Sequence, residues 1–174
     1  METTKNDFQP NVKLFFYNLS DYLDTKLLYY GSIQRIDFIP GKSDIDILIF
    51  TDNEYSLISK MQHYLHMSHR DFKKVIWQLG DTMVYGYKLQ YINTDEQIIA
   101  EFSIYNDRYK DVILNEYTNK FILPIYITIM LYIVKILHYQ LCILTKKQYS
   151  TVKRFILNTL LGHDDTKFWL LHPK

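Results

Sequence analysis

Two aspartates, Asp44 and Asp46, interrupt the apolar segment "SDIDILIFT" at residues 43–51. In an extended strand, side chains two positions apart project from the same face, so the two carboxylates should lie together while Ile45 and Ile47 point into a core. Neighbouring carboxylates raise each other's pKa unless a cation neutralises them, and Mg²⁺ prefers such oxygen ligands. The pair therefore predicts a divalent metal site, whereas a solvent-facing strand end is the simpler alternative for Asp-x-Asp alone.

A glycine and a serine, Gly31 and Ser32, precede the two aspartates at the end of a short apolar segment. Glycine lets the backbone approach a ligand closely, and the following serine offers a hydroxyl and amides to a phosphate where a helix begins. A Gly-Ser dipeptide alone is as common as any turn. Its combination with Asp44 and Asp46 indicates a site for a polyphosphate beside a metal ion.

This combination resembles the signature of the DNA polymerase beta-like nucleotidyltransferase superfamily, in its small or minimal members. Tyr30-Gly31-Ser32 matches its first part, and Asp44-Ile45-Asp46-Ile47 matches the second after a spacer of similar length. Arg35 falls where small members often carry an arginine, but Ile36 replaces the glycine that follows it there. This departure makes the loop stiffer.

The resemblance implies a third carboxylate on a later, neighbouring strand. Glu101, in "IIAEFSIY", is the acid flanked by apolar residues there, and the wet face of a hairpin beside Ser103 is the alternative. The implied reaction is in-line attack of an acceptor hydroxyl on the α-phosphorus of a nucleoside triphosphate, with release of pyrophosphate. Asp44, Asp46 and Glu101 would be the catalytic residues and the ligands of two Mg²⁺ ions, or of Mn²⁺.

The nucleotide, expected to be ATP, would contact a second set of residues. Lys135 interrupts an apolar helix and needs an anion, which the triphosphate could supply, unless its stem extends to solvent. Tyr149 and Lys153, four positions apart, could stack on a base and contact a phosphate, or belong to an ordinary amphipathic helix. The expected nucleotide-binding residues are Gly31, Ser32, Arg35, Lys42, Ser43, Lys135, Tyr149 and Lys153.

The elements that must position these residues predict an α/β (α+β) fold, with a mixed nucleotidyltransferase-type sheet of about five strands flanked by helices. Strands are expected at 26–30, at 43–51 and three times between 73 and 105; the expected helices are 11–24, the segment after 52, 109–117, 122–144 and 146–161, the last ended by Gly162. Residues 1–108 would form the catalytic core. Residues 109–174 would form a C-terminal helical part packed on it as one compact unit.

Composition limits the class of protein. Hydrophobic residues make up 48% and charged residues 22% of the 174 residues, an ordinary balance for a folded domain. The net charge is +1, with the basic excess after residue 121, so tight binding to long nucleic acid is not favoured. The single cysteine, Cys142, lies in an apolar helical pattern that suits a core position, and a chain with one cysteine fits a reducing compartment. The N-terminus lacks the apolar core of a signal peptide. The cysteine content and the N-terminus both favour a cytoplasmic location.

The apolar segment "FILPIYITIMLYIV", residues 121–134, is too short to span a membrane. It predicts a helix buried against the sheet or a partner, and homo-oligomerisation or a protein partner through 121–144 is possible, with Tyr126 and Tyr132 as contacts. His63, His66 and His69 recur every third residue, which favours a solvated helix end over a zinc site.

Two functions are therefore open. One is a metal-dependent transfer of a single nucleoside monophosphate, expected to be AMP, to a hydroxyl on a small molecule, a protein or an RNA end. The other is an inactive nucleotidyltransferase-fold protein that acts as an antitoxin-like or regulatory binding partner.

Overall fold

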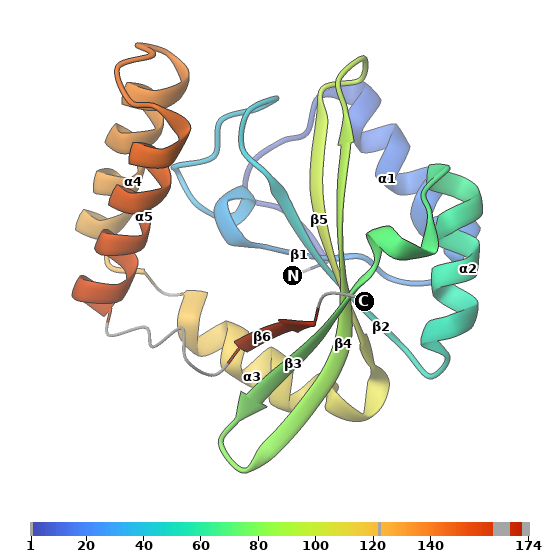
Figure 1. Ribbon diagram of the computed structural model, residues 1–174. Helices are drawn as coiled ribbons and strands as arrows, with labels where there is room; N and C mark the ends of the chain where they lie inside the picture. The colour runs from blue at the N-terminus through green and yellow to red at the C-terminus, as the bar shows by residue number, and fades with distance from the viewer. Residues whose placement is uncertain (1, 122, 162–167, 172–174) are drawn as a thin grey trace.

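A mixed six-stranded sheet forms the centre of the computed structural model, which describes residues 2–121, 123–161 and 168–171 (Figure 1). The strands lie side by side in the order β1 (Leu28–Tyr30), β2 (Ile45–Thr51), β5 (Ile98–Asn106), β4 (Thr82–Asn93), β3 (Lys73–Leu79) and β6 (Phe168–Leu171). β2 and β5 are parallel, and the other pairings in the described sheet are antiparallel. The expected mixed sheet is confirmed, with a short sixth strand added at its edge.

Five helices surround this sheet: α1 (Pro10–Leu23), α2 (Glu54–Leu65), α3 (Lys110–Phe121), α4 (Ile125–Tyr139) and α5 (Lys146–Leu161). Local signals explain their ends. Pro10 occupies the first turn of α1, where a missing N–H costs nothing, and the Asn53 side chain accepts a hydrogen bond of 3.0 Å from the Ser56 amide at the start of α2. None of the helices in the described part of the chain has the length and apolarity that a membrane crossing requires.

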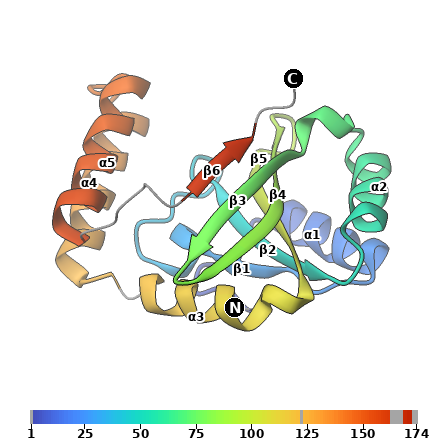
Figure 2. The same ribbon diagram turned by 60° about the horizontal axis from the view of Figure 1, so that its bottom comes forward.

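Helices α1 and α2 cover one face of the sheet and α3 covers part of the other (Figures 1 and 2). The alternation of side chains along β2 serves both faces. Ile45, Ile47 and Ile49 are buried in the core shared with α1 and α2, whereas Leu48 and Phe50 belong to the core beneath α3. Asp46 lies between Ile45 and Ile47 in the chain and therefore projects from the α3 face.

Helices α4 and α5 pair with each other at one end of the molecule, away from α1 and α2 (Figures 1 and 2). They share a small core of their own, made by Ile127, Leu131, Val134 and Ile156. The opposite face of α4 is exposed and does not pack against the sheet, so its burial against a partner, the other expected arrangement, stays a prediction.

Two further expectations differ from the structure. Cys142 is exposed, with a φ of 52°, in the connection between α4 and α5, and not in a core. Residues 168–171 form β6, so the chain is not helical to its end. Gly162, which was expected to end the last helix, lies outside the described residues.

Candidate active site

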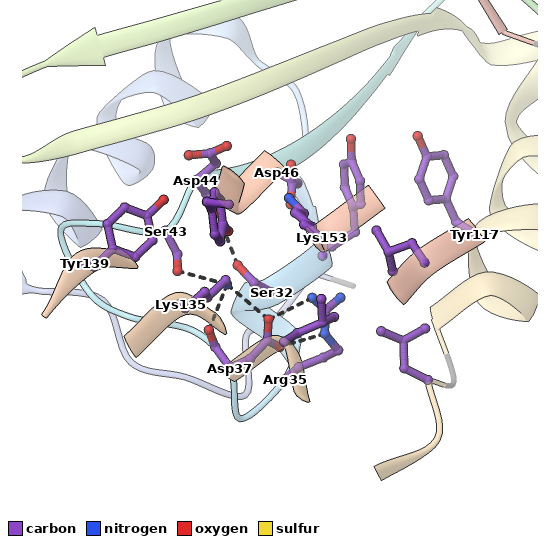
Figure 3. Close-up of a pocket in the computed structure, with 16 residues that line it drawn as sticks. Ser32, Arg35, Asp37, Ser43, Asp44, Asp46, Tyr117, Lys135, Tyr139 and Lys153 are labelled. Atoms are coloured by element: carbon purple, nitrogen blue, oxygen red, sulfur yellow. Dashed lines mark hydrogen bonds and ion pairs between the residues drawn. The ribbon is translucent and has the colours of Figure 1, made fainter. Parts of the chain in front are cut away.

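A cavity of about 300 Å³ lies between the sheet end that carries Asp44 and Asp46 and the α4–α5 pair (Figure 3). Nine of the residues expected from the sequence line it: Gly31, Ser32, Arg35, Ser43, Asp44, Asp46, Lys135, Tyr149 and Lys153. Lys42 is exposed and does not line it, and neither does Glu101. The structure therefore brings together side chains that are more than 100 positions apart in the chain.

The turn after β1 lies directly against Asp46. Gly31 begins a short 3₁₀ turn, Gly31–Gln34 (η1), with a φ of 72° that other residues rarely adopt. A Cβ atom at this position would be 1.9 Å from Oδ2 of Asp46, so only glycine lets the carboxylate lie here. Ser32 is buried, and its hydroxyl donates a 3.4 Å hydrogen bond to the carbonyl of Asp44, which ties the turn to the start of β2.

The surroundings of Asp46 favour its uncharged form. Asp46 lies opposite Tyr30 on β1 and opposite Glu101 on β5, and is therefore enclosed by both neighbouring strands. Burial, followed by the negative charge of Glu101, raises its pKa to about 7; Asp44 adds to the shift, and Lys153 and Lys88 oppose it. A bound cation would relieve this unfavourable cluster of carboxylates.

Asp44 and Asp46 fit the oxygen ligands of a divalent cation. Both line the cavity, and the space left by the missing side chain of Gly31 is filled by the Asp46 carboxylate itself. Glu101 fits less well, because its Oε1 accepts a hydrogen bond and ion pair from Nζ of Lys88 on β4. Among the described residues, no three His, Cys, Asp or Glu side chains are arranged to hold a metal ion together.

A buried ion cluster forms the floor of the cavity (Figure 3). Asp37, which is fully buried, accepts two hydrogen bonds from Arg35, at 2.8 Å from Nε and 3.1 Å from Nη2. Nζ of Lys135 lies 3.0 Å from Oδ2 of Asp37 and donates to the Asp37 carbonyl at 2.8 Å and to the Ser43 hydroxyl at 3.1 Å. These contacts use all three donors of the ammonium group.

Asp37 is therefore the anion that Lys135 requires. Lys135 is only 6% exposed, so its stem does not extend to solvent, and its expected pairing with a triphosphate meets a site already filled by Asp37. Burial opposes ionisation of Asp37, but hydrogen bonds and charge from Arg35, followed by Lys135, outweigh it and lower its pKa. Burial also lowers the pKa of Lys135, against the opposing effect of Asp37. Asp37 was missed from the sequence.

Lys153 supplies positive charge from the opposite wall. It comes from α5, is exposed to the cavity, and opposes the rise in the pKa of Asp46. Among the cavity-lining residues that the structure describes, Lys153 is the cation with no hydrogen bond or ion pair. It is therefore available to a phosphate group.

Aromatic side chains stand beside Lys153. The ring of Tyr149 stacks on His138 with centroids 4.7 Å apart and planes 13° apart, and the ring centroid of Tyr139 is 5.7 Å from that of Tyr149. His138 Nδ1 donates to the Leu144 carbonyl at 2.7 Å, which fixes the imidazole. Tyr139 and Tyr149 both line the cavity, so they offer an aromatic wall to a base.

Tyrosines from two other elements close the cavity beside Asp46. The rings of Tyr30 and Tyr117 meet edge to face with centroids 4.7 Å apart. Burial raises the pKa of Tyr117, and hydrogen bonding to Tyr30 opposes that rise. The hydroxyl of Tyr30 also lies 3.4 Å from that of Ser103. These groups keep their protons and can donate hydrogen bonds next to the carboxylates.

Residues 13–124 match the family described as "Nucleotidyltransferase domain". A solved structure of Cid1, a protein with RNA terminal uridylyl transferase activity, is similar with a TM-score of 0.39 and 17% identity; the similarity covers 73% of this chain and 39% of that one. No curated protein matches the chain.

Proposed function

Since the chain belongs to the nucleotidyltransferase domain family, we propose that it transfers a nucleoside monophosphate, expected to be AMP, from a nucleoside triphosphate to an acceptor hydroxyl. The observation that carries this proposal is the position of Asp44 and Asp46 in one cavity with the Gly31–Ser32 turn and Lys153. The acceptor classes expected from the sequence are a small molecule, a protein side chain and an RNA end.

In the proposed reaction, the acceptor oxygen attacks the α-phosphorus, the bond from this phosphorus to the β-phosphate bridging oxygen breaks, and pyrophosphate leaves. Lys153 would neutralise the phosphates from α5, and Ser32 would position them at the turn. Asp44 and Asp46 would hold a divalent cation, which supplies charge neutralisation when bound. Glu101, beside Asp46 in the sheet register, is the predicted acceptor of the hydroxyl proton.

Arg35 and Lys135 have a different role in this proposal from the one expected from the sequence. Both already share Asp37 as their anion, so they fix the loop between η1 and β2 relative to α4. Tyr139 and Tyr149 would contact the base.

A specific observation also supports the second candidate function, a catalytically inactive binding protein. Glu101, the expected third carboxylate, is held by Lys88 and lies outside the cavity lining. A protein that binds nucleotide without transferring it would tolerate this arrangement. The two candidates differ in whether label from the α-phosphate reaches an acceptor.

The test uses the full chain with Mg²⁺ and each of the four α-³²P-labelled nucleoside triphosphates. Small-molecule, protein and RNA fractions of a cell extract serve as separate acceptor pools. We expect Asp44→Ala and Asp46→Ala to lower label transfer by at least about 100-fold. Asp52→Ala, an exposed acid just beyond the other end of β2, is the matched control and should transfer normally. No transfer by the wild-type protein, with nucleotide binding unchanged in both site variants, would support the inactive protein.

A further inference from the structure

The pair formed by Lys88 and Glu101 differs from the two-ion site expected from the sequence. Lys88 lies opposite Ser103 on β5, two positions along from Glu101, and the side chains of both project from the face that carries Asp46. Their contact joins Nζ of Lys88 to Oε1 of Glu101. The third carboxylate therefore already has a cation, and this cation is part of the chain.

The charges of the described side chains agree with this arrangement. Asp44, Asp46 and Glu101 carry three negative charges when ionised, and Lys88 balances one of them. One divalent cation balances the remaining two, and Lys153, which faces Asp46 from α5, is left to balance a phosphate. A second divalent cation at Glu101 would bind a carboxylate that already pairs with the ammonium group, and would then lie beside that group, where like charges repel.

The position of Lys88 in the sheet also keeps its side chain close to Glu101. Its side chain is 22% exposed and that of Glu101 is 35% exposed, so both are partly shielded from water. β4 is the neighbour of β5 over eight paired positions, from Gly86↔Tyr105 to Asn93↔Ile98, which fixes the Cα atom of Lys88 one strand away from Glu101. A lysine that swung aside would still leave its charge close to the site.

We propose that the ammonium group of Lys88 takes the place of the divalent cation that Glu101 would otherwise bind, so that the site holds one divalent cation, at Asp44 and Asp46. This inference rests on the proposed function for its purpose, but the number of bound ions can be measured without any transfer reaction. The lysine would act as a built-in counterion for Glu101 and would be a positioning residue.

The experiment counts Mn²⁺ bound to the full-length protein, using electron paramagnetic resonance of the free ion during a titration, without nucleotide. We expect one Mn²⁺ per chain for the wild-type protein. Lys88→Met frees Glu101 and should bind two, with the spectrum of a coupled ion pair. Asp46→Asn should bind neither ion tightly.

Two control variants separate the charge of Lys88 from a general effect of substitution. Lys88→Arg keeps the positive charge and should still bind one ion. Lys74→Met removes an exposed lysine from β3, opposite Tyr87, and should also bind one ion. Melting temperatures of all variants check that each is folded.

The inference is overturned if the wild-type protein binds two Mn²⁺ ions or none. It is also overturned if the folded Lys88→Met protein binds a single ion. The proposed function can fail while the inference holds. In that case the wild-type protein transfers no label, but the number of bound Mn²⁺ ions still rises from one to two in Lys88→Met. Transfer that persists in a wild-type protein with two ions would leave the proposed function standing and remove the inference.

Discussion

Asp46 lies between Tyr30 on β1 and Glu101 on β5, and this position makes the ionised form of its carboxyl group unfavourable in the folded protein. Burial and the charge of Glu101 raise its pKa to about 7, far above its usual value of 3.8. At pH 8 without a cation, the folded protein must therefore keep an ion that it disfavours. A bound cation would remove this cost, because its charge stabilises the ionised carboxylate.

We predict that Asp46→Asn stabilises the cation-free protein at pH 8. The folded-state pKa of Asp46 lies above the unfolded one, so the cost of ionising it in the fold is complete above pH 7 and disappears as the pH falls toward 4. After allowance for solvent screening, a gain of about 1–2 kcal/mol, or about 3–6 °C in melting temperature, is expected at pH 8.

The measurement compares thermal unfolding of the two proteins in EDTA from pH 8 to pH 4. The difference in melting temperature should shrink as the pH falls through 7. A difference that is the same at every pH, or a less stable Asp46→Asn protein at pH 8, would contradict the assigned environment of this carboxylate.

The sequence predicted those site residues whose signal is local. Asp44, Asp46, Gly31 and Ser32 lie within 16 positions, and alternation along one strand is enough to place the two aspartates together. The roles of Asp37 and Lys88 depend on partners set by the fold. Lys135 is 98 positions from Asp37, and Lys88 meets Glu101 only through the β4–β5 register. Two features of the sequence point to Asp37. It is an acid two positions after Arg35, and Lys135, in an apolar helix, needs an anion.

At the scale of elements, the buried ion cluster connects α4 to the segment between η1 and β2. Lys135 projects from α4, and Asp37 and Ser43 lie on the segment that leads to Asp44. This contact holds the α4–α5 pair beside the sheet, because α4 packs mainly on α5. The salt bridge between Lys135 and Asp37, with the hydrogen bonds around it, therefore positions the helices that form the far wall of the cavity.

We predict that Asp37→Asn lowers the free energy of unfolding by about 3–5 kcal/mol, because it leaves Lys135 buried without its counter-charge. Urea denaturation at neutral pH measures the change. Glu2→Gln, which breaks the exposed pair with Lys26, is the control and should change the free energy of unfolding by less than about 1 kcal/mol. A loss below 1 kcal/mol in Asp37→Asn would show that water or another group replaces the carboxylate.

Elements with a clear local pattern were predicted from the sequence, and β6 was not. Helix α1 starts at Pro10 and ends at Leu23, one position from the expected 11–24, because its apolar spacing and proline both act locally. Strand β6 is only four residues long and exists by pairing with β3, from which it is about 90 positions away. No local pattern in so short a segment separates a strand from the end of a helix.

At the scale of the whole molecule, α4 presents an apolar face that no other described element covers. One face of α4 exposes Ile125, Tyr126, Ile129, Met130, Tyr132 and Ile133. These positions follow the helical repeat, and the face carries no charged side chain, since Lys135 is buried on the opposite side. Contiguous apolar surface of this kind is typical of an interface.

We predict that the protein self-associates through this face of α4, as the sequence allowed. Ile129→Lys combined with Ile133→Lys should convert the dimer or larger species to a monomer, because two charges cannot be buried in an apolar interface. Sedimentation velocity measures the masses. Leu14→Lys combined with Tyr17→Lys replaces two exposed apolar residues of α1 and should leave the assembly unchanged. A monomeric wild-type protein would contradict the prediction.

The position of β5 in the sheet determines the order in which the molecule can fold. β1 pairs with β2 and β4 pairs with β3, and β5, which follows both pairs in the chain, lies between them. A nascent chain that has emerged only as far as Asn93 therefore has two separate strand pairs, each with an open edge where another chain could add. Insertion of β5 closes both edges in one event and brings Glu101 beside Asp46 at the same moment. Pairing of Glu101 with Asp46 and protection of the β2 and β4 edges are thus the same folding step.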